Sequence, residues 1–170
     1  ATNIIDKWPF ATDENATDVG DLTQQRGWGA AASSTTYGYY AGGFHWIPPS
    51  GRYNIIDKYA FASDGNATDV GDLLGARTMS ISSSTTTHGF SLGSYPVGNA
   101  EKYSHVSDGN STQIPGLGTP AYFGSGNTSD TNHYITQHYG TAVPGFGPTY
   151  NTGVVKAPIA SEDAYSDTGV

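Results

Sequence analysis

The sequence predicts an all-β protein built from tandem antiparallel units of about 50 residues each. Charged residues make up only 13% of the chain, while glycine fills 23 positions and aromatic residues reach 12%. This composition favours short strands joined by tight turns. No window sustains apolar residues at the i, i+3, i+4 and i+7 spacing of an amphipathic helix. In addition, a long segment recurs almost unchanged along the chain.

The recurring segment defines the repeat. Residues 3–22 reappear as residues 54–73, with sixteen of twenty positions identical at a shift of 51. A third copy follows at a shift of 44, where residues 101–103 match residues 57–59, and a fourth begins near residue 156. We therefore predict a single domain over residues 1–170 that contains four repeats. Their boundaries lie at about 1–51, 52–96, 97–150 and, for the start of the fourth, 151–170.

One unit shows the features of several short strands. Residues 4–8 are β-branched and aromatic and predict a strand, and the Asp/Asn/Gly cluster after them predicts a turn. Arg26 and Arg77 then occupy equivalent positions. A small-residue segment (residues 30–34) and an aromatic–glycine segment (residues 37–43) complete the unit. We expect these two segments to pair as inner strands of one sheet.

The order of these elements resembles the kelch repeat. An arginine, a small-residue strand and an aromatic strand ending in Gly42-Gly43 follow one another. The phrasing of the repeat also resembles kelch-like repeats in structural proteins of tailed phages, particularly marine ones. The resemblance implies a β-propeller segment. Because about three and a third units cannot close a ring alone, an open β-repeat array is the alternative.

The resemblance implies a non-enzymatic structural or adhesive component of a phage particle, such as a tail fibre, an appendage or a decoration protein. Its location would be the virion, and its partners would be copies of itself, other virion proteins and host-surface carbohydrate. The alternative is a secreted, glycosylated repeat protein that assembles into an extracellular filament. The chain has no cysteine, so the Tyr–Cys cofactor implied by a likeness to galactose oxidase is absent. No catalytic residue is predicted.

Charge and hydropathy exclude two classes of partner. The net charge is −8 and the seven basic residues form no cluster, so the sequence predicts no nucleic-acid binding. No apolar run approaches the length of a membrane span, so no membrane insertion is expected. No cofactor is predicted, apart from the Ca²⁺ ion that an acidic loop could hold.

The acidic loop of the second repeat is the candidate metal site. Alternating oxygen side chains with a glycine are typical of Ca²⁺ loops, since this cation takes six to eight oxygen ligands. The alternative is that these side chains cap turns by accepting hydrogen bonds from nearby backbone N–H groups. The five histidines are expected to be surface residues or hydrogen-bond partners. The predicted ligands are Asp64, Asn66, Asp69 and Asp72.

Two further sets of residues are candidates for recognition or modification. Four asparagines lie in Asn-x-Ser/Thr sequons, which would be glycosylated only in a secretory pathway: Asn15, Asn66, Asn110 and Asn127. Aromatic residues with polar tips are common at carbohydrate-facing surfaces. Those selected as ligand-surface residues are Tyr39, Tyr40, Trp46 and Tyr53.

Overall fold

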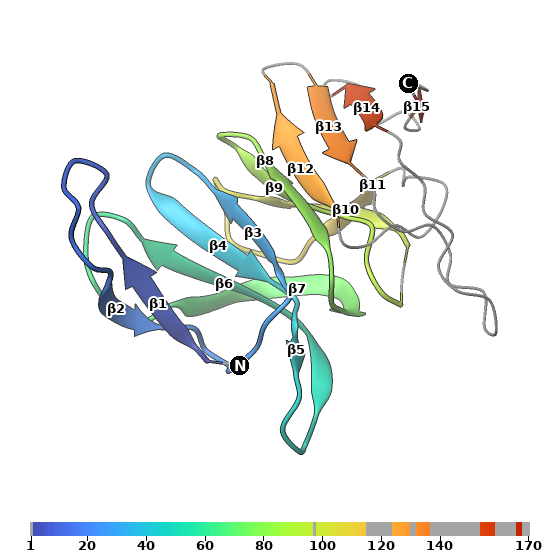
Figure 1. Ribbon diagram of the computed structural model, residues 1–170. Helices are drawn as coiled ribbons and strands as arrows, with labels where there is room; N and C mark the ends of the chain where they lie inside the picture. The colour runs from blue at the N-terminus through green and yellow to red at the C-terminus, as the bar shows by residue number, and fades with distance from the viewer. Residues whose placement is uncertain are drawn as a thin grey trace.

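The computed structural model describes residues 2–96, 98–114, 124–129, 132–136, 154–158 and 166–167. Within these ranges the chain contains strands and turns and no helix, which confirms the predicted all-β class (Figure 1). Parts of predicted repeats 3 and 4 lie outside the described residues. The strands are β1 (Ile4–Lys7), β2 (Thr17–Asp21), β3 (Ala30–Ser33), β4 (Tyr37–Ala41), β5 (Phe44–His45), β6 (Gly51–Ala60), β7 (Thr68–Arg77), β8 (Ile81–Ser84), β9 (His88–Leu92), β10 (Ala100–Ser104), β11 (Thr112–Ile114), β12 (Ser125–Thr128), β13 (Asn132–Thr136), β14 (Val154–Pro158) and β15 (Ser166–Asp167).

The strands form several antiparallel sheets, as Figure 1 shows. The first sheet contains β3, β4, β6 and β7 in that order, and the short β5 also pairs with β6. The second sheet contains β8 to β11, and the third contains β12 to β15. The strands β1 and β2 form a separate pair. Each four-strand set thus joins the last two strands of one sequence repeat to the first two strands of the next.

The lysine of the recurring segment lies opposite the same repeat position in every described copy. Lys7 lies opposite Thr17 in the β1–β2 pair, and Lys58 lies opposite Thr68 in the first sheet. Both pairs shift register at the same repeat position. Near-identical sequences therefore occupy equivalent backbone positions. The series continues with Lys102 opposite Thr112 and Lys156 opposite Ser166.

The first strands of the three sheets lie next to one another. The Ser84 hydroxyl on β8 donates to the Ser33 carbonyl on β3 at 2.7 Å. The Thr128 hydroxyl on β12 donates to the Ser84 carbonyl at 2.5 Å. The sheets therefore meet along β3, β8 and β12 and spread apart from there (Figure 1). The expected pairing of the small-residue and aromatic–glycine segments is present as β3 and β4.

Two apolar cores fill the spaces between these sheets. The side chains that face each other are small, branched or aromatic, as strands packed on a neighbouring sheet require. One core joins the first and second sheets: Ala32, Tyr39, Ala41, Ile56, Leu73 and Tyr103. The other joins the second and third sheets: Ile81, Phe90, Leu92, Ala100, Ile114 and Ile135.

The outer edges of β2 and β7 are each covered by a turn of the next sheet. The Gly65 N–H donates to the Val19 carbonyl at 2.7 Å, and the Asn66 carboxamide oxygen accepts from the Asp21 N–H at 3.0 Å. A Cβ on Gly20 would lie 2.2 Å from the Gly65 oxygen, so this approach requires glycine. Covered edges cannot pair with other chains. The equivalent contacts on β7 involve Gly71, Asp72, Gly109 and Asn110.

A buried ion pair recurs in the first two sheets. The Arg26 guanidinium lies 2.9 Å from the Asp57 carboxylate, and both side chains are fully buried. Thr23 donates to the same carboxylate from its N–H at 2.9 Å and its hydroxyl at 2.6 Å. Arg77 pairs with Glu101 in the same way, and burial lowers the pKa of Arg77 to about 10. The first pair ties the loop before β3 to β6, and the second ties the end of β7 in the first sheet to β10 in the second sheet.

Candidate functional site

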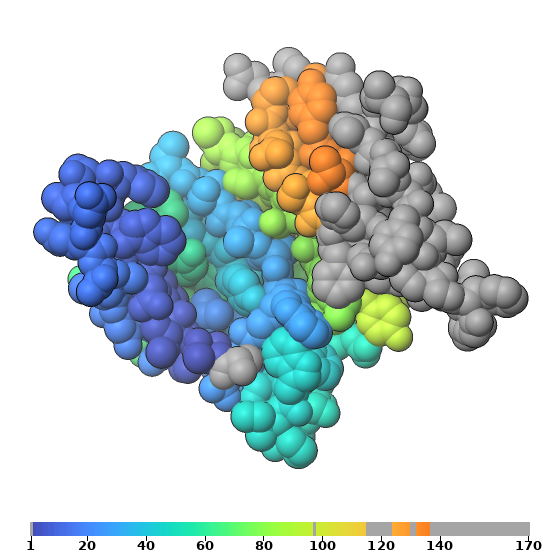
Figure 2. Space-filling model, in the orientation of Figure 1, coloured from blue at the N-terminus to red at the C-terminus, as the bar shows by residue number. Residues whose placement is uncertain are grey.

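The strongest candidate site is a hairpin that the first repeat contains and the second repeat lacks. The repeat shift falls from 51 to 44, so the connection between β4 and the conserved part of β6 is seven residues longer than its counterpart between β9 and β10. The extra residues form β5 and the start of β6. This hairpin projects at the lower edge of the molecule, away from the other sheets (Figures 1 and 2). Loops carried on a rigid scaffold are common sites of recognition.

Three aromatic rings cluster at the base of the hairpin. The rings of Trp28 and Trp46 lie 4.2 Å apart, centre to centre, in an edge-to-face contact, and Phe44 lies 5.2 Å from Trp46. Paired backbone hydrogen bonds between Gly27 and Phe44, at 2.9 and 2.8 Å, hold the two segments together. Trp28 is 48% exposed and Trp46 is 43% exposed. The cluster thus presents large ring surfaces to solvent.

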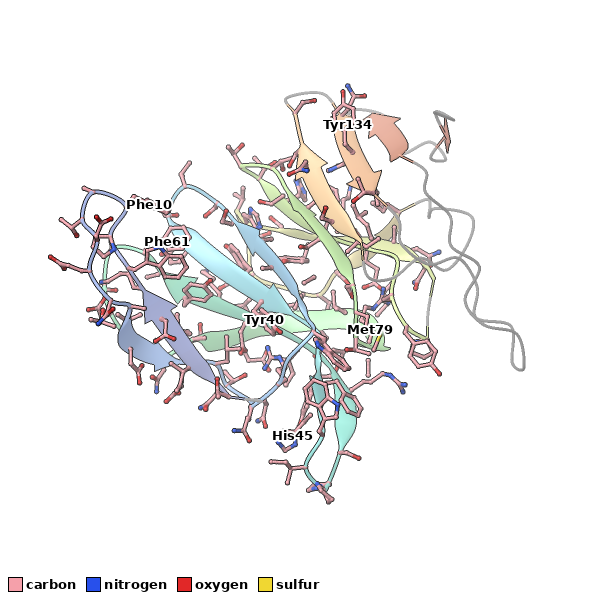
Figure 3. All side chains as sticks on the ribbon, viewed as in Figure 1. Phe10, Tyr40, His45, Phe61, Met79 and Tyr134 are labelled. Atoms are coloured by element: carbon pink, nitrogen blue, oxygen red, sulfur yellow. The ribbon has the colours of Figure 1, made fainter. Side chains whose placement is uncertain are left out.

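Polar residues lie on the same hairpin and close to it along the chain. The His45 Nε2 atom lies 3.1 Å from the Gln25 Oε1 atom, and His45 lies at the lower end of the molecule in Figure 3. The Arg52 guanidinium sits 4.7 Å from the centre of the half-exposed Tyr95 ring. Ring faces next to amide, imidazole and guanidinium groups can bind a ligand that has both apolar C–H faces and hydroxyl groups.

The backbone that presents Trp28 belongs to the repeat itself. Trp28 has a φ of 59°, and Met79, at the equivalent position 51 residues later, has the same φ of 59°. The Trp28 carbonyl also accepts the Met79 N–H at 2.8 Å. A side chain in this left-handed conformation is uncommon. The turn is therefore shared by both repeats, and the first repeat places a tryptophan on it.

The structure separates the four predicted ligand-surface aromatics. Trp46 is exposed, as expected for a ligand surface, but Tyr39 is only 1% exposed and stacks on His105 with ring centres 4.3 Å apart. The Tyr40 hydroxyl accepts the Gly29 N–H at 2.8 Å, and Tyr53 is half-buried. Tyr39 is therefore a core residue. Trp28, which the sequence did not single out, is the partner of Trp46.

Three of the four predicted calcium ligands, Asp64, Asn66 and Asp69, interact with protein groups through their side chains. The Asp64 carboxylate pairs with Lys7, and the Asn66 carboxamide accepts the Asp21 N–H. Asp69 accepts the Gly71 N–H at 3.1 Å in a local turn. The Asp69 contact is of the turn-capping kind, whereas the Asp64 and Asn66 side chains contact the β1–β2 pair. Within the described ranges, no group of three or more His, Cys, Asp or Glu side chains is placed to hold a metal ion.

The four sequon asparagines are exposed. Asn66 and Asn110 use their carboxamide oxygens to accept the N–H groups of Asp21 and Asp72, both at 3.0 Å. Asn15 lies on the loop between β1 and β2, at the same repeat position as Asn66. Asn127 lies instead on β12, opposite Tyr134.

A serine–histidine pair is sealed between the second and third sheets. The Ser83 hydroxyl lies 2.8 Å from the His133 Nδ1 atom, and the two residues are 4% and 2% exposed. The His133 ring also contacts Phe90 edge-to-face. Burial lowers the pKa of His133 to about 4, so the ring is neutral near pH 7. The pair bridges two strands, as the hydrogen-bond-partner prediction for histidine proposes.

The exposed aromatic hairpin thus remains the candidate site.

Among the described residues, no helix has the length and apolar character needed to cross a membrane. No protein-family model matches the chain, and no curated protein matches its sequence.

Proposed function

We propose that this chain is a non-enzymatic structural and adhesive component of a phage particle, located on the virion as part of a tail fibre, an appendage or a decoration. The observation that carries the proposal is the contrast between a repeated scaffold and the hairpin inserted in the first repeat. The same turn contacts and buried ion pairs recur between sheets. The exposed Trp28–Trp46 cluster occurs once.

The scaffold in this proposal is a kelch-like propeller segment. Support comes from β3, β8 and β12, which lie side by side while the other strands of each sheet extend outward. This is how blades are arranged around a propeller axis. Small-angle scattering of the purified protein distinguishes a closed propeller ring from an open β-repeat array. A ring predicts a compact disc, whereas an open array predicts a length that grows with concentration.

The hairpin in this proposal binds host-surface carbohydrate. Sugar rings pack their C–H faces on exposed indoles such as those of Trp28 and Trp46. Hydrogen-bonding groups on the same hairpin come from His45, which contacts Gln25, and from Arg52. We expect the protein to bind members of an array of bacterial lipopolysaccharide and capsule fragments. Trp46→Ala should weaken that binding at least tenfold, because the ring surface is lost.

The matched control for this experiment is Phe10→Ala. Phe10 is fully exposed and lies on the β1–β2 loop, away from the hairpin. The control should bind the array as the parent protein does. Equal binding by Trp46→Ala and the parent would refute glycan recognition by the hairpin. Electron microscopy of purified particles with a gold-labelled antibody tests the virion location. The proposal requires gold label on a tail or a capsid.

The sequons favour a second candidate, a secreted and glycosylated repeat protein that polymerises into an extracellular filament. Asn15, Asn66 and Asn110 are exposed and occupy the same place in successive repeats. Their partners would be copies of the same chain. Mass spectrometry of the native protein decides between the two candidates. Hexosamine on these asparagines supports the filament, and unmodified asparagines support the phage particle.

A further inference from the structure

Within the described residues, the free edge of β1 corresponds to an edge that is paired with another strand in the equivalent strands β6 and β10. Strand β6 pairs with β4 on one edge and β7 on the other, and β10 pairs with β9 and β11. Among the described residues, β1 pairs only with β2, although it keeps the register and bulge of β6. An edge of this kind can accept an additional strand.

The acidic residue of this pair also differs from its counterparts. Asp57 and Glu101 are fully buried, and each binds the arginine that precedes the first strand of its sheet in the sequence. Asp6, at the equivalent position on β1, is exposed, and no ion pair of Asp6 is found within the described ranges. Because Asp6 keeps the acidic group of this repeat position, it can bind an arginine that another segment supplies.

Two hollows flank the open edge. One, of about 470 Å³, is lined by Asp6, Leu22 and Arg26. The Trp28 and Trp46 side chains of the aromatic cluster also line this hollow. In the first sheet the equivalents of Leu22 and Arg26 are Leu73 and Arg77, and both pack against Gly42 at the end of β4. A Cβ added to Gly42 would lie only 3.0 to 3.3 Å from their atoms. The hollow is therefore where a glycine that ends an incoming strand would pack.

The second hollow, of about 290 Å³, is lined by Ile5, Tyr59, Phe61 and neighbouring residues. Figure 3 shows Phe10 and Phe61, which also lines this hollow, on the same side of the molecule. In the next sheet the equivalents of Tyr59 and Phe61 are Tyr103 and His105, and they contact the Tyr39 ring of β4. The second hollow thus corresponds to the place of an incoming aromatic side chain.

We infer that the β1 edge binds a β-hairpin of the same repeat type, presented by a further repeat unit. That hairpin carries an arginine, a small-residue strand and an aromatic strand ending in paired glycines, as residues 22–43 do. Its guanidinium binds Asp6, its glycines pack on Leu22 and Arg26, and its aromatic ring packs on Tyr59. The inference rests on the repeat geometry, although Trp28 and Trp46, the rings of the proposed glycan site, line the first hollow as well.

A synthetic peptide with the sequence of residues 22–43 tests this inference. We expect saturable binding to the full chain by calorimetry, with amide shifts at Ile5, Asp6 and Lys7 in NMR spectra. Asp6→Asn in the chain, or Arg26→Met in the peptide, should weaken binding at least tenfold. Asp13→Asn, which changes an exposed acid in the β1–β2 loop, is the matched control and should bind the peptide normally.

Two outcomes would overturn the inference. One is peptide binding that Asp6→Asn leaves unchanged, and the other is no binding at millimolar concentration. If the peptide aggregates, a fusion that joins residues 22–43 to the chain through a flexible linker replaces it. The fusion should raise the melting temperature by several degrees, and the Asp6→Asn version should not. Glycan binding is measured separately, so loss of one activity does not imply loss of the other.

Discussion

The third sheet differs from the first two in chemistry but not in backbone register. Lys156 lies opposite Ser166 on β14 and β15, as Lys58 lies opposite Thr68 in the first sheet. At the position of the buried acids Asp57 and Glu101, however, the third sheet has Val155. The sequence also contains no arginine after Arg77. Both members of the ion pair are therefore missing together.

A second pair changes in the same coordinated way. Gly38 lies opposite Tyr59 in the first sheet, and a Cβ on Gly38 would lie 2.3 Å from the tyrosine Cζ atom. The tyrosine ring thus covers the glycine. In the third sheet the same cross-strand position holds His133 opposite Ala157. The large side chain is thus on the other strand of the pair, and one of the two opposed residues is small in both sheets. This contrast indicates that opposed positions vary as pairs.

Breaking the ion pair should give the largest effect. Arg77→Met leaves the Glu101 carboxylate buried without its cation, which should lower the free energy of unfolding by about 3–5 kcal/mol in urea titrations. The double variant Arg77→Met, Glu101→Leu imitates the third sheet and should recover at least half of that loss. A single variant as stable as the parent would show that the pair contributes little.

The His133 side chain should make stability depend on pH. Its folded pKa of about 4 is below the ordinary value of 6.5, so the unfolded chain binds more protons between these values. Stability should therefore fall as pH drops from 6.5 to 4, by up to about 3 kcal/mol from this residue. His133→Gln should have a flatter profile over that range. Parallel profiles for parent and variant would contradict the assignment.

The glycine–tyrosine pair should show coupling between its members. A Cβ on Gly89 would lie 2.4 Å from the Tyr103 ring, so Gly89→His should cost about 1–3 kcal/mol. In a Tyr103→Ala background, which imitates the His133–Ala157 pair, the same substitution should cost at least about 1 kcal/mol less. Unfolding free energies of the four proteins give this comparison directly. Additive losses would mean that the two positions are independent.

The partly exposed ion pair should give the smallest effect. The Lys58 ammonium lies 2.7 Å from the Asp108 carboxylate, which is 55% exposed. Lys58→Ala should cost less than about 1 kcal/mol, and the loss should shrink at high salt. Thermal melts at low and high salt provide the measurement. A loss as large as that of Arg77→Met would mean that solvent does not screen this pair.

The sequence predicted the strands and their equivalence because near-identical segments fold alike. It did not predict where one sheet ends and the next begins. A repeat defines a period, whereas the grouping of strands depends on which edges pair in space. The pairing of β4 with β6 therefore crosses the boundary near residue 51.

The candidate site was predicted in part. Trp46 was selected, but Trp28 was not, because the two residues come together only when the Gly27–Phe44 bridge forms. Tyr39 was assigned to a ligand surface, yet it packs in the core, since alternate residues of a strand face opposite sides. The buried partner of Arg26 was also missed. An acidic residue occurs at the same position in three repeats, as Asp6, Asp57 and Glu101. This recurrence is the signal that could have indicated the partner of Arg26.

Cross-strand NMR contacts test the central claim, that equivalent repeat segments form equivalent sheets. The account predicts backbone contacts between Tyr39 and Lys58 and, in the second sheet, between Phe90 and Lys102. Absence of both contacts, with β7 paired to β8 instead, would contradict it, because each repeat would then form its own sheet.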